Sequence, residues 1–340
     1  MRITDFSKHL EKYLSSYLPD SKNLSKNTIS SYCDTFRLFL RFCRDEKNIP
    51  VEKMSFKHLD ENLIYEFIEW LKNERKSGVS TCNQRLAAIH AFIYYVQAES
   101  PEHLLTFQKI LNIPRKKQSR PTVKYFTIDE LKSVLAQPDV NTVNGRRDMV
   151  LLSVLYDSGA RVQELADLRL RDIRLEYPAH LHLTGKGRKS REVPLMQKTV
   201  NILRNYILEN RLNFAEKLDY PLFFNKQKNK ITRGGIAYIL NKYIQLAKTD
   251  CPCIPVNATP HAMRHTKAMH LLKAGVNLIY IRDILGHADI SSTEIYARVD
   301  TDMKRIALEK LEDTHTPDVT SWSDDKDLMA WLKAFGKTNL

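Results

Sequence analysis

Five side chains in the middle and C-terminal parts of the chain are of the types that could together cleave a phosphodiester bond without a metal ion. They are Arg161, His261, Arg264, His287 and Tyr296. A phenol can attack phosphorus, an imidazole can accept its proton, and guanidinium groups can stabilise the negative charge that develops on the phosphate oxygens. The set therefore indicates phosphoryl transfer through a tyrosine.

Tyr296 is the candidate nucleophile. Because a free phenol has a pKa of about 10, it needs a base at neutral pH; His261 or, less directly, His287 could take its proton. Arg161 and Arg264 suit the transition state, since guanidinium is always charged and can contact two phosphate oxygens at once. His261 and Arg264 stand three positions apart, which predicts that they share one helical face.

The leaving oxygen of the phosphodiester also needs a proton. Lys186 is the candidate general acid, because it lies in a Gly-Lys-Gly turn between two predicted strands, where it could reach into a groove. His287 would donate a hydrogen bond to the phosphate. No metal ligand set or cofactor motif is evident in the sequence, and we expect none to be needed.

Each of these residues also has a structural interpretation when it is taken alone. Arg161 could form an ordinary intrahelical ion pair with Glu164, and Lys186 could be a plain turn residue. We expect His265 and His270 to be structural, because they are predicted to lie off the helical face that carries the catalytic groups. The order and context of the whole set favour the catalytic interpretation.

Helical periodicity dominates the first hundred or so residues. Apolar residues recur at three- and four-residue steps over 26–44, 60–75 and 80–98, and Ser25 is a plausible N-cap for the first of these helices. Short amphipathic helices with short connections predict a small helical bundle.

A basic segment without acidic residues follows, at about 108–124, and contains Pro114 and Pro121. It is either a solvated linker or a linker that tracks DNA phosphates, in contacts that salt would weaken steeply. Its candidate DNA-binding residues are Lys109, Arg115, Lys116, Lys117, Arg120 and Lys124.

A second domain is predicted from Phe126. Thr127 and Glu130 form a capping-box pattern at the start of a helix. Helices are expected at about 145–158, 161–168, 197–210, 233–248, 261–274, 278–285 and 291–310. Between them, 180–184 and 192–195 alternate with a period of two and flank a basic turn, which predicts a β-hairpin with Arg188 and Lys189 as DNA contacts. The fold class is therefore mainly α with a small antiparallel β-sheet.

The composition is that of a basic globular protein. The formal net charge of +13 indicates a polyanionic partner. No apolar run approaches the length of a membrane span, and the N-terminus has no signal-peptide core. Five scattered cysteines favour a reducing compartment over a disulfide framework, so we expect a cytoplasmic protein.

In their order and spacing, these segments resemble the active-site boxes of the tyrosine recombinase (phage integrase) family, including its Xer-type members. The pattern is an Arg followed by Glu-Leu, a Gly-Lys-Gly hairpin, His-x-x-Arg-His, Leu-Gly-His, and a Tyr nine residues after that His. The resemblance assigns Arg161, Lys186, His261, Arg264 and His287 to phosphate activation and Tyr296 to the covalent link. It also implies that Glu164 is a buried acidic partner of the Arg161 region. The match is strong over 126–310 and weaker over 24–32.

The resemblance further implies a mechanism and an assembly. The tyrosine cleaves one strand, forms a 3′-phosphotyrosyl bond and releases a 5′-hydroxyl, with no ATP, metal or cofactor. Two rounds of exchange pass through a four-way junction in a homotetramer on two double-stranded DNA sites, each with inverted half-sites, and accessory proteins could take part. The domains expected are a helical core-binding domain (1–108), a linker (109–125), a catalytic domain (126–312) and a tail (313–340).

The tail extends beyond the compact Xer pattern. Leu328, Trp331, Leu332 and Phe335 form an apolar stripe on a predicted helix, with Ser323 as its predicted N-cap and Gly336 as its predicted stop. The stripe either packs on its own domain or docks on a neighbouring subunit. The tail favours integration, excision or transposition of a mobile element. Alternatives are Xer-type resolution of chromosome or plasmid dimers, a type IB topoisomerase-like activity, and a catalytically silent DNA-binding protein.

Overall fold

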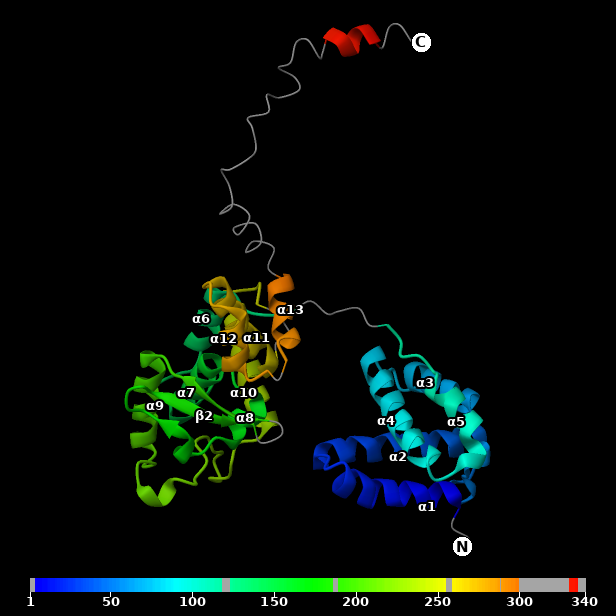
Figure 1. Ribbon diagram of the computed structural model, residues 1–340. Helices are drawn as coiled ribbons and strands as arrows, with labels where there is room; N and C mark the ends of the chain where they lie inside the picture. Colours follow the sequence, from blue (N-terminus) through cyan, green and yellow to red (C-terminus); the bar gives the residue numbers. More distant parts are fainter. Residues whose placement is uncertain are drawn as a thin grey trace. The chain divides into compact units, whose positions relative to one another are not determined.

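The computed structural model describes residues 4–117, 123–185, 189–254, 259–287, 289–299 and 330–335. The chain divides into two compact units, Met1–Pro121 and Thr122–Leu340. We call them the N-terminal and C-terminal units. The division falls within the predicted linker, and the described part of the N-terminal unit is built of helices, whereas the C-terminal unit combines helices with a small sheet (Figure 1).

The N-terminal unit contains the predicted helical bundle. Its helices are α1 (Asp5–Lys12), a π-helix (Tyr13–Ser21), α2 (Lys26–Lys47), α3 (Glu61–Asn73), α4 (Val79–Gln97) and α5 (Leu104–Leu111), with 3-10 turns at Val51–Lys53, Phe56–His58 and Pro101–His103. The three helices predicted from periodicity correspond to α2, α3 and α4. The hydroxyl of Ser25 caps α2 by accepting a hydrogen bond from the backbone N–H of Thr28 at 3.3 Å, as expected.

Aromatic side chains fill the core of this bundle. Phe92 lies at its centre, with ring centroids 5.1 Å from Phe36, 5.6 Å from Phe6 and 5.2 Å from Tyr13, in edge-to-face arrangements that complement the ring quadrupoles. The helical faces that carry these residues are therefore held by one continuous apolar cluster.

The linker begins later than residue 109, which corrects the predicted boundary. α5 continues through Leu111 because Phe107 and Ile110 are fully buried in the bundle core. Lys109 consequently lies in the last helical turn. After α5 the chain remains hydrogen-bonded to the bundle, since the backbone N–H of Lys116 donates to Oδ1 of Asn83 at 3.0 Å and its carbonyl accepts from Nδ2 of Asn83 at 2.9 Å.

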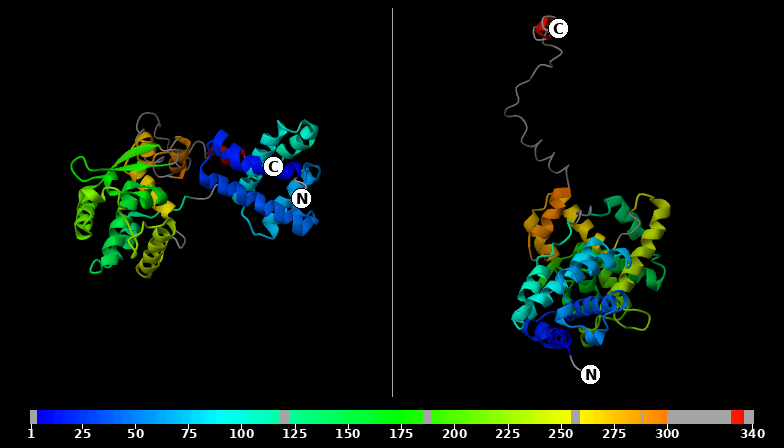
Figure 2. Two further views of the ribbon diagram at one scale, coloured as in Figure 1. Left: turned by 90° about the horizontal axis from the view of Figure 1, so that it is seen from below. Right: turned by 90° about the vertical axis from the view of Figure 1, so that its right-hand side faces the viewer.

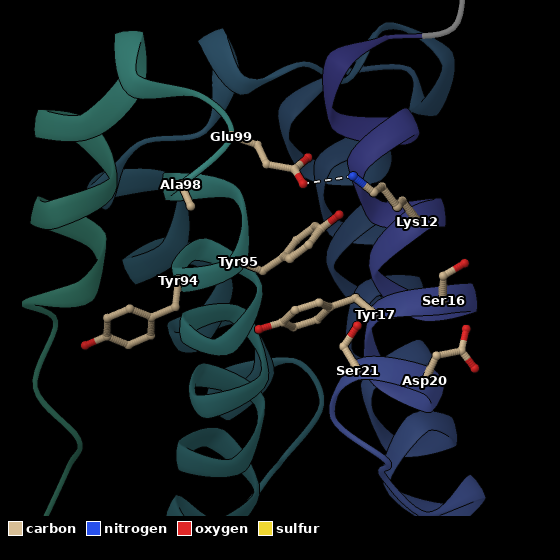
Figure 3. A pocket seen from close by; sticks show the side chains of 9 residues that line it. All are labelled: Lys12, Ser16, Tyr17, Asp20, Ser21, Tyr94, Tyr95, Ala98 and Glu99. Carbon is tan, nitrogen blue, oxygen red and sulfur yellow. Dashed lines mark hydrogen bonds and ion pairs between the residues drawn. The ribbon is translucent and has the colours of Figure 1, made fainter.

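A cavity of about 450 Å³ opens beside the π-helix and α4 (Figure 3). The rings of Tyr17 and Tyr95 line it with centroids 4.5 Å apart, and the ion pair of Lys12 with Glu99, at 2.8 Å, borders it. All residues that line it belong to the N-terminal unit, whereas the six predicted catalytic residues belong to the C-terminal unit.

The C-terminal unit contains the predicted hairpin within a three-stranded sheet. Its elements are α6 (Ile128–Ala136), α7 (Val143–Ser158), α8 (Val162–Asp167), β1 (Ile173–Arg174), β2 (His180–Thr184), β3 (Ser190–Pro194), α9 (Gln197–Glu209), α10 (Arg233–Asp250), α11 (Pro260–Lys273), α12 (Leu278–Leu285) and α13 (Ser291–Val299), with 3-10 turns at Leu170–Asp172 and Ala215–Lys217. The sheet is antiparallel in the order β1-β2-β3, and His182 pairs with Glu192. The predicted capping box of Thr127 and Glu130 starts α6.

Two apolar clusters hold this unit together. The larger surrounds α7, whose Leu151, Leu152 and Leu155 are fully buried against the helices around it. The smaller joins α11, α12 and α13, which lie side by side (Figures 1 and 2), and it includes Leu285 and Tyr296. The predicted nucleophile is therefore part of a packed core, and not of a loop.

The described part of the tail is a helix over 330–335. Trp331, Leu332 and Phe335 are all exposed on it, and the rings of Trp331 and Phe335 stack with centroids 5.1 Å apart. The predicted cap Ser323, the first apolar position Leu328 and the predicted stop Gly336 lie outside the described residues. Among the helices described in both units, none is both long enough and apolar enough to cross a membrane.

Candidate active site

A sharp turn between α7 and α8 places Arg161. α7 ends at Gly159, which adopts φ 56°, a left-handed conformation that favours glycine. A β-carbon there would lie 2.9 Å from the side chain of Leu285, so the turn also packs tightly against α12. Arg161 follows as the N-terminal cap of α8, and its backbone N–H donates to Oε2 of Glu164 at 2.9 Å.

Glu164 is buried and shared by two arginines. Its Oε1 accepts from Nη1 of Arg161 at 2.8 Å, and its two oxygens accept from Nη1 and Nη2 of Arg191 at 3.2 and 2.8 Å. Burial alone would raise the pKa of Glu164, but the hydrogen bonds from Arg191 and from Arg161 outweigh it and lower the pKa to about 2. The carboxylate is therefore ionised and accepts bonds from both guanidinium groups.

The C-terminal end of α12 gathers three guanidinium groups. Arg191 donates from Nε to the carbonyl of Ile284 at 2.8 Å, Arg264 donates from Nη2 to the carbonyl of Leu285, and Arg161 donates from Nη2 to the carbonyl of Gly286 at 3.1 Å.

Helix carbonyls at this end lack intrahelical partners and carry the negative end of the helix dipole. They can therefore hold several cations close together without neutralising them as carboxylates would. The result is a concentrated positive charge suited to an anion.

Arg264 is the most deeply placed of the three cations. It is 1% exposed, and its Nη1 also donates to the carbonyl of Gly159 at 2.8 Å. Its Nε is buried and has no hydrogen-bond partner among the described residues. Burial, with repulsion from Arg161 and Arg191, lowers the pKa of Arg264 to about 10, so the group remains charged at neutral pH.

Tyr296 lies beside three histidines. Its hydroxyl is 2.8 Å from Nδ1 of His265, and its side chain is 1% exposed. The His287 ring is nearly parallel to that of Tyr296, with centroids 6.4 Å apart, and Nδ1 of His287 is 2.9 Å from the hydroxyl of Thr293. The His261 and His265 ring centroids are 4.4 Å apart. The phenol thus contacts His265 directly, and the His261 ring packs against the His265 ring.

The placement of His265 corrects the expectation that it lies off the catalytic face. His261 and His265 are four residues apart, a spacing that puts them on the same side of a helix, and this spacing was a signal available in the sequence. His270, by contrast, is structural as expected. It lies 2.9 Å from the hydroxyl of Tyr156 and 3.0 Å from the carbonyl of Phe126.

The electrostatic environment keeps these rings neutral and the phenol protonated. Burial and the neighbouring arginines lower the pKa of His261, and burial with nearby His261 and Arg264 lowers that of His265 to about 4. The pKa of His287 falls to about 4, chiefly through burial. Burial raises the pKa of Tyr296, although Arg264 opposes this.

A cavity of about 580 Å³ gives access to the arginine cluster. Arg161, which is 37% exposed, lines it together with Arg191 and His287. The base of the hairpin forms another wall, where the backbone N–H of Gly185 donates to the carbonyl of Lys189 at 2.8 Å. The cavity has room for a phosphate group next to Arg161.

Some predicted site residues lie elsewhere or cannot be placed. Lys186, Arg188 and Arg120 lie outside the described residues. The exposed basic residues of the linker region and hairpin are Lys109, Arg115, Lys116, Lys117, Lys124 and Lys189. Lys116 differs from the other exposed basic residues, because its ammonium group pairs with Glu69 and lowers the pKa of that carboxyl group. Arg191, which the sequence analysis did not single out, joins the site.

Comparison with known proteins identifies the family of the chain. Residues 124–303 match the model of the phage integrase family, and residues 8–102 match its N-terminal SAM-like domain. A putative integrase/recombinase, y4rC, of Sinorhizobium fredii is 35% identical over 96% of this chain and 97% of its own length. Tyrosine recombinase XerC of Oceanobacillus iheyensis is 31% identical over 88% of this chain and 96% of its own length.

Solved structures share the fold at lower identity. XerH bound to a palindromic difH substrate in a post-cleavage complex has a TM-score of 0.67 and 21% identity, covering 86% of this chain and 82% of its own. The Tn1549 transposon integrase in complex with transposon right-end DNA has a TM-score of 0.69 and 18% identity, covering 88% of this chain and 98% of its own. The mainly helical fold with a small antiparallel sheet is thus confirmed. The chain belongs to the phage integrase family and is a tyrosine recombinase, an enzyme that cleaves and rejoins DNA.

Proposed function

We propose that the chain is a site-specific recombinase that cleaves DNA through Tyr296. The phenolic oxygen forms a bond to the scissile phosphorus while the bond from phosphorus to the 5′ oxygen breaks. The DNA is left with a 3′-phosphotyrosyl bond and a free 5′-hydroxyl. The observation that carries this proposal is the convergence of three guanidinium groups on the end of α12, next to His287 and Tyr296.

The arginine cluster would stabilise the transition state. Arg161, Arg191 and Arg264 each carry one positive charge, and the carboxylate of Glu164 neutralises one of the three. The cluster therefore keeps two net positive charges. Negative charge on the non-bridging oxygens increases as the phenol attacks, and fixed cations stabilise this state more than the ground state. Arg161 lines the open cavity and is the direct contact in this proposal.

Tyr296 would have to leave His265 before it attacks. In the resting protein the phenol is buried and can donate its proton to Nδ1 of a neutral His265. Moving the hydroxyl towards the phosphate would expose it to His261 or His287, the bases proposed for the reaction. Lys186, at the turn of the hairpin, is the proposed general acid that protonates the 5′ oxygen.

Strand exchange would occur between two double-stranded DNA sites, each with inverted half-sites, in a homotetramer that passes through a four-way junction. The exposed residues Arg115, Lys117, Lys124 and Lys189 are proposed phosphate contacts. The apolar helix over 330–335 is proposed to dock on a neighbouring subunit, since its exposed aromatic side chains would be covered there.

The proposed role is integration, excision or transposition of a mobile element. Its support is the 35% identity to a putative integrase/recombinase that extends over nearly the whole of both chains. Resolution of chromosome or plasmid dimers is the second candidate, and the 31% identity to a tyrosine recombinase XerC favours it.

A covalent-trapping experiment tests the proposed function. Nicked duplexes with a randomised segment are incubated with the protein, and DNA that stays attached in denaturing detergent is recovered and sequenced. We expect the wild-type protein to enrich an inverted-repeat site and Tyr296→Phe to trap nothing. Capture by Tyr296→Phe at the wild-type level would overturn the proposal. Two recovered sites on one plasmid then distinguish exchange, which yields junctions and recombinant circles, from simple relaxation.

A further inference from the structure

Arg191 is a mostly buried cation on β3, 11% exposed at its side chain, whose charge is part of the arginine cluster but to which no individual role has yet been given. We propose that Arg191 is a positioning residue for DNA cleavage. It holds Glu164 and the end of α12, so that Arg161 faces the phosphate with a positive charge that Glu164 does not neutralise. This inference rests on the proposed function of the arginine cluster.

The contacts of Arg191 join three elements that are separate in the sequence. Its two terminal nitrogens donate to both oxygens of Glu164 on α8, and its Nε donates to the carbonyl of Ile284 on α12. Such a forked contact with a carboxylate fixes geometry as well as energy. One side chain therefore ties the hairpin to the helix of Arg161 and to the turn that leads to His287.

The same contacts set the charge of the site. Without Arg191, the buried carboxylate of Glu164 would have Arg161 as its cation, and the pair would be neutral. With Arg191 present, Glu164 serves two guanidinium groups, and one positive charge remains for the phosphate. Arg161 is the more exposed of the two, at 37% against 11%, so the remaining charge is presented at Arg161.

Lysine could not make these contacts together. Its single ammonium nitrogen cannot span two carboxylate oxygens and a backbone carbonyl in a fixed plane, whereas guanidinium presents five N–H donors in a rigid fork. A lysine at this position would therefore keep the charge and lose the geometry, which makes it an informative intermediate variant.

The test measures cleavage of suicide duplexes that carry the site recovered from the randomised library. The variants are Arg191→Met, Arg191→Lys and the double variant Arg191→Met/Glu164→Gln. Arg174→Met, which alters an exposed arginine on β1 of the same sheet, is the matched control. Wild type and Tyr296→Phe are run beside them, because absence of any wild-type capture would contradict the proposed function and not the role of Arg191.

We expect Arg191→Met to slow cleavage by between about 10- and 100-fold, less than loss of a direct oxyanion donor, while DNA binding is kept. The double variant should recover part of the rate, because it restores one net positive charge at Arg161. The control should cleave at the wild-type rate. Arg191→Lys should fall between Arg191→Met and wild type.

A second substrate separates positioning of charge from simple structural support. When the scissile phosphate is replaced by an uncharged methylphosphonate, less negative charge develops, and the penalty of Arg191→Met should shrink. If that variant does not fold, Arg191→Gln, which also removes the charge, provides the same comparison. Wild-type cleavage by Arg191→Met would overturn the proposal. The proposal would also be overturned if adding Glu164→Gln to Arg191→Met slowed cleavage further and the loss of rate were equal on the phosphate and methylphosphonate substrates.

Discussion

Replacing Gly286 by alanine should disturb the arginine cluster through one added methyl group. Gly286 has φ 64°, and a β-carbon there would lie 2.8 Å from Cδ, 2.9 Å from Nη1 and 3.0 Å from Nε of Arg191. Its carbonyl also accepts the hydrogen bond from Arg161. The methyl group must therefore displace the guanidinium of Arg191 or the turn that holds Arg161.

The magnitude follows from two contributions. A left-handed conformation costs about 1–2 kcal/mol for a residue with a β-carbon, and overpacking adds about 1–3 kcal/mol. Gly275→Ala is a matched control, because Gly275 has φ 81° but nothing within 4 Å of an added β-carbon. We expect a loss of unfolding free energy of about 1–2 kcal/mol for Gly275→Ala and about 2–5 kcal/mol for Gly286→Ala.

Urea unfolding of the full chain, followed by circular dichroism, measures this difference. Tryptophan fluorescence is unsuitable: of the 3 tryptophans, Trp70 lies on α3 in the N-terminal unit, Trp331 is exposed on the helix over 330–335, and Trp322 lies outside the described residues. Suicide-substrate cleavage should fall by about 100-fold for Gly286→Ala, as expected for a catalytic group moved by about 1 Å, and remain near wild type for Gly275→Ala. Equal losses of stability and activity in the two variants would refute the reasoning.

Three further predictions concern two other residues of the site and the tail. His265→Phe should lower stability by about 1–3 kcal/mol, because it leaves the phenol of Tyr296 buried without a partner. The double variant His265→Phe/Tyr296→Phe should regain part of the lost stability. Strictly additive shifts in melting temperature would argue against the hydrogen bond. The folded-state pKa of Glu164 lies below its ordinary value, so the stability that it contributes, about 3 kcal/mol, is present above pH 4.5 and is lost as the pH falls towards 2. Glu164→Gln should therefore flatten the acid unfolding curve between these pH values. An unchanged curve would contradict this. Deletion of 317–340 should spare DNA binding in mobility-shift assays but impair junction formation, and unchanged recombination would count against an intersubunit role.

The sequence predicts most elements of the fold because periodicity and capping are local properties. The apolar spacing of α2, α3 and α4, and the capping box and turn residues of the second unit, each depend on residues a few positions apart. α5 was not predicted, and the first domain was expected to end at residue 108, since the last turn of α5 is fixed by burial of Ile110 in a core assembled from distant helices. β1, only two residues long, carries no periodic signal of its own.

The site was predictable in its parts and less so in its arrangement. The residue types and their order point to Arg161, Arg264 and Tyr296, but nothing local indicates that α12 presents three successive carbonyls to three arginines. Arg191 belongs to β3, where the alternation of apolar and polar residues predicts which side chains are buried but does not indicate which of them belong to a site. His265 was available from its four-residue spacing to His261. Burial of the phenol against His265 depends on how α13 packs on α11.

Mapping the covalent adduct tests the central claim most directly. The wild-type protein is trapped on a suicide duplex, the complex is digested with protease and nuclease, and the modified peptide is sequenced by mass spectrometry. We predict a nucleotide joined through its 3′ phosphate to Tyr296, the tyrosine beside His265 and His287. An adduct on another of the 15 tyrosines, or a 5′-phosphate linkage at Tyr296, would contradict the account.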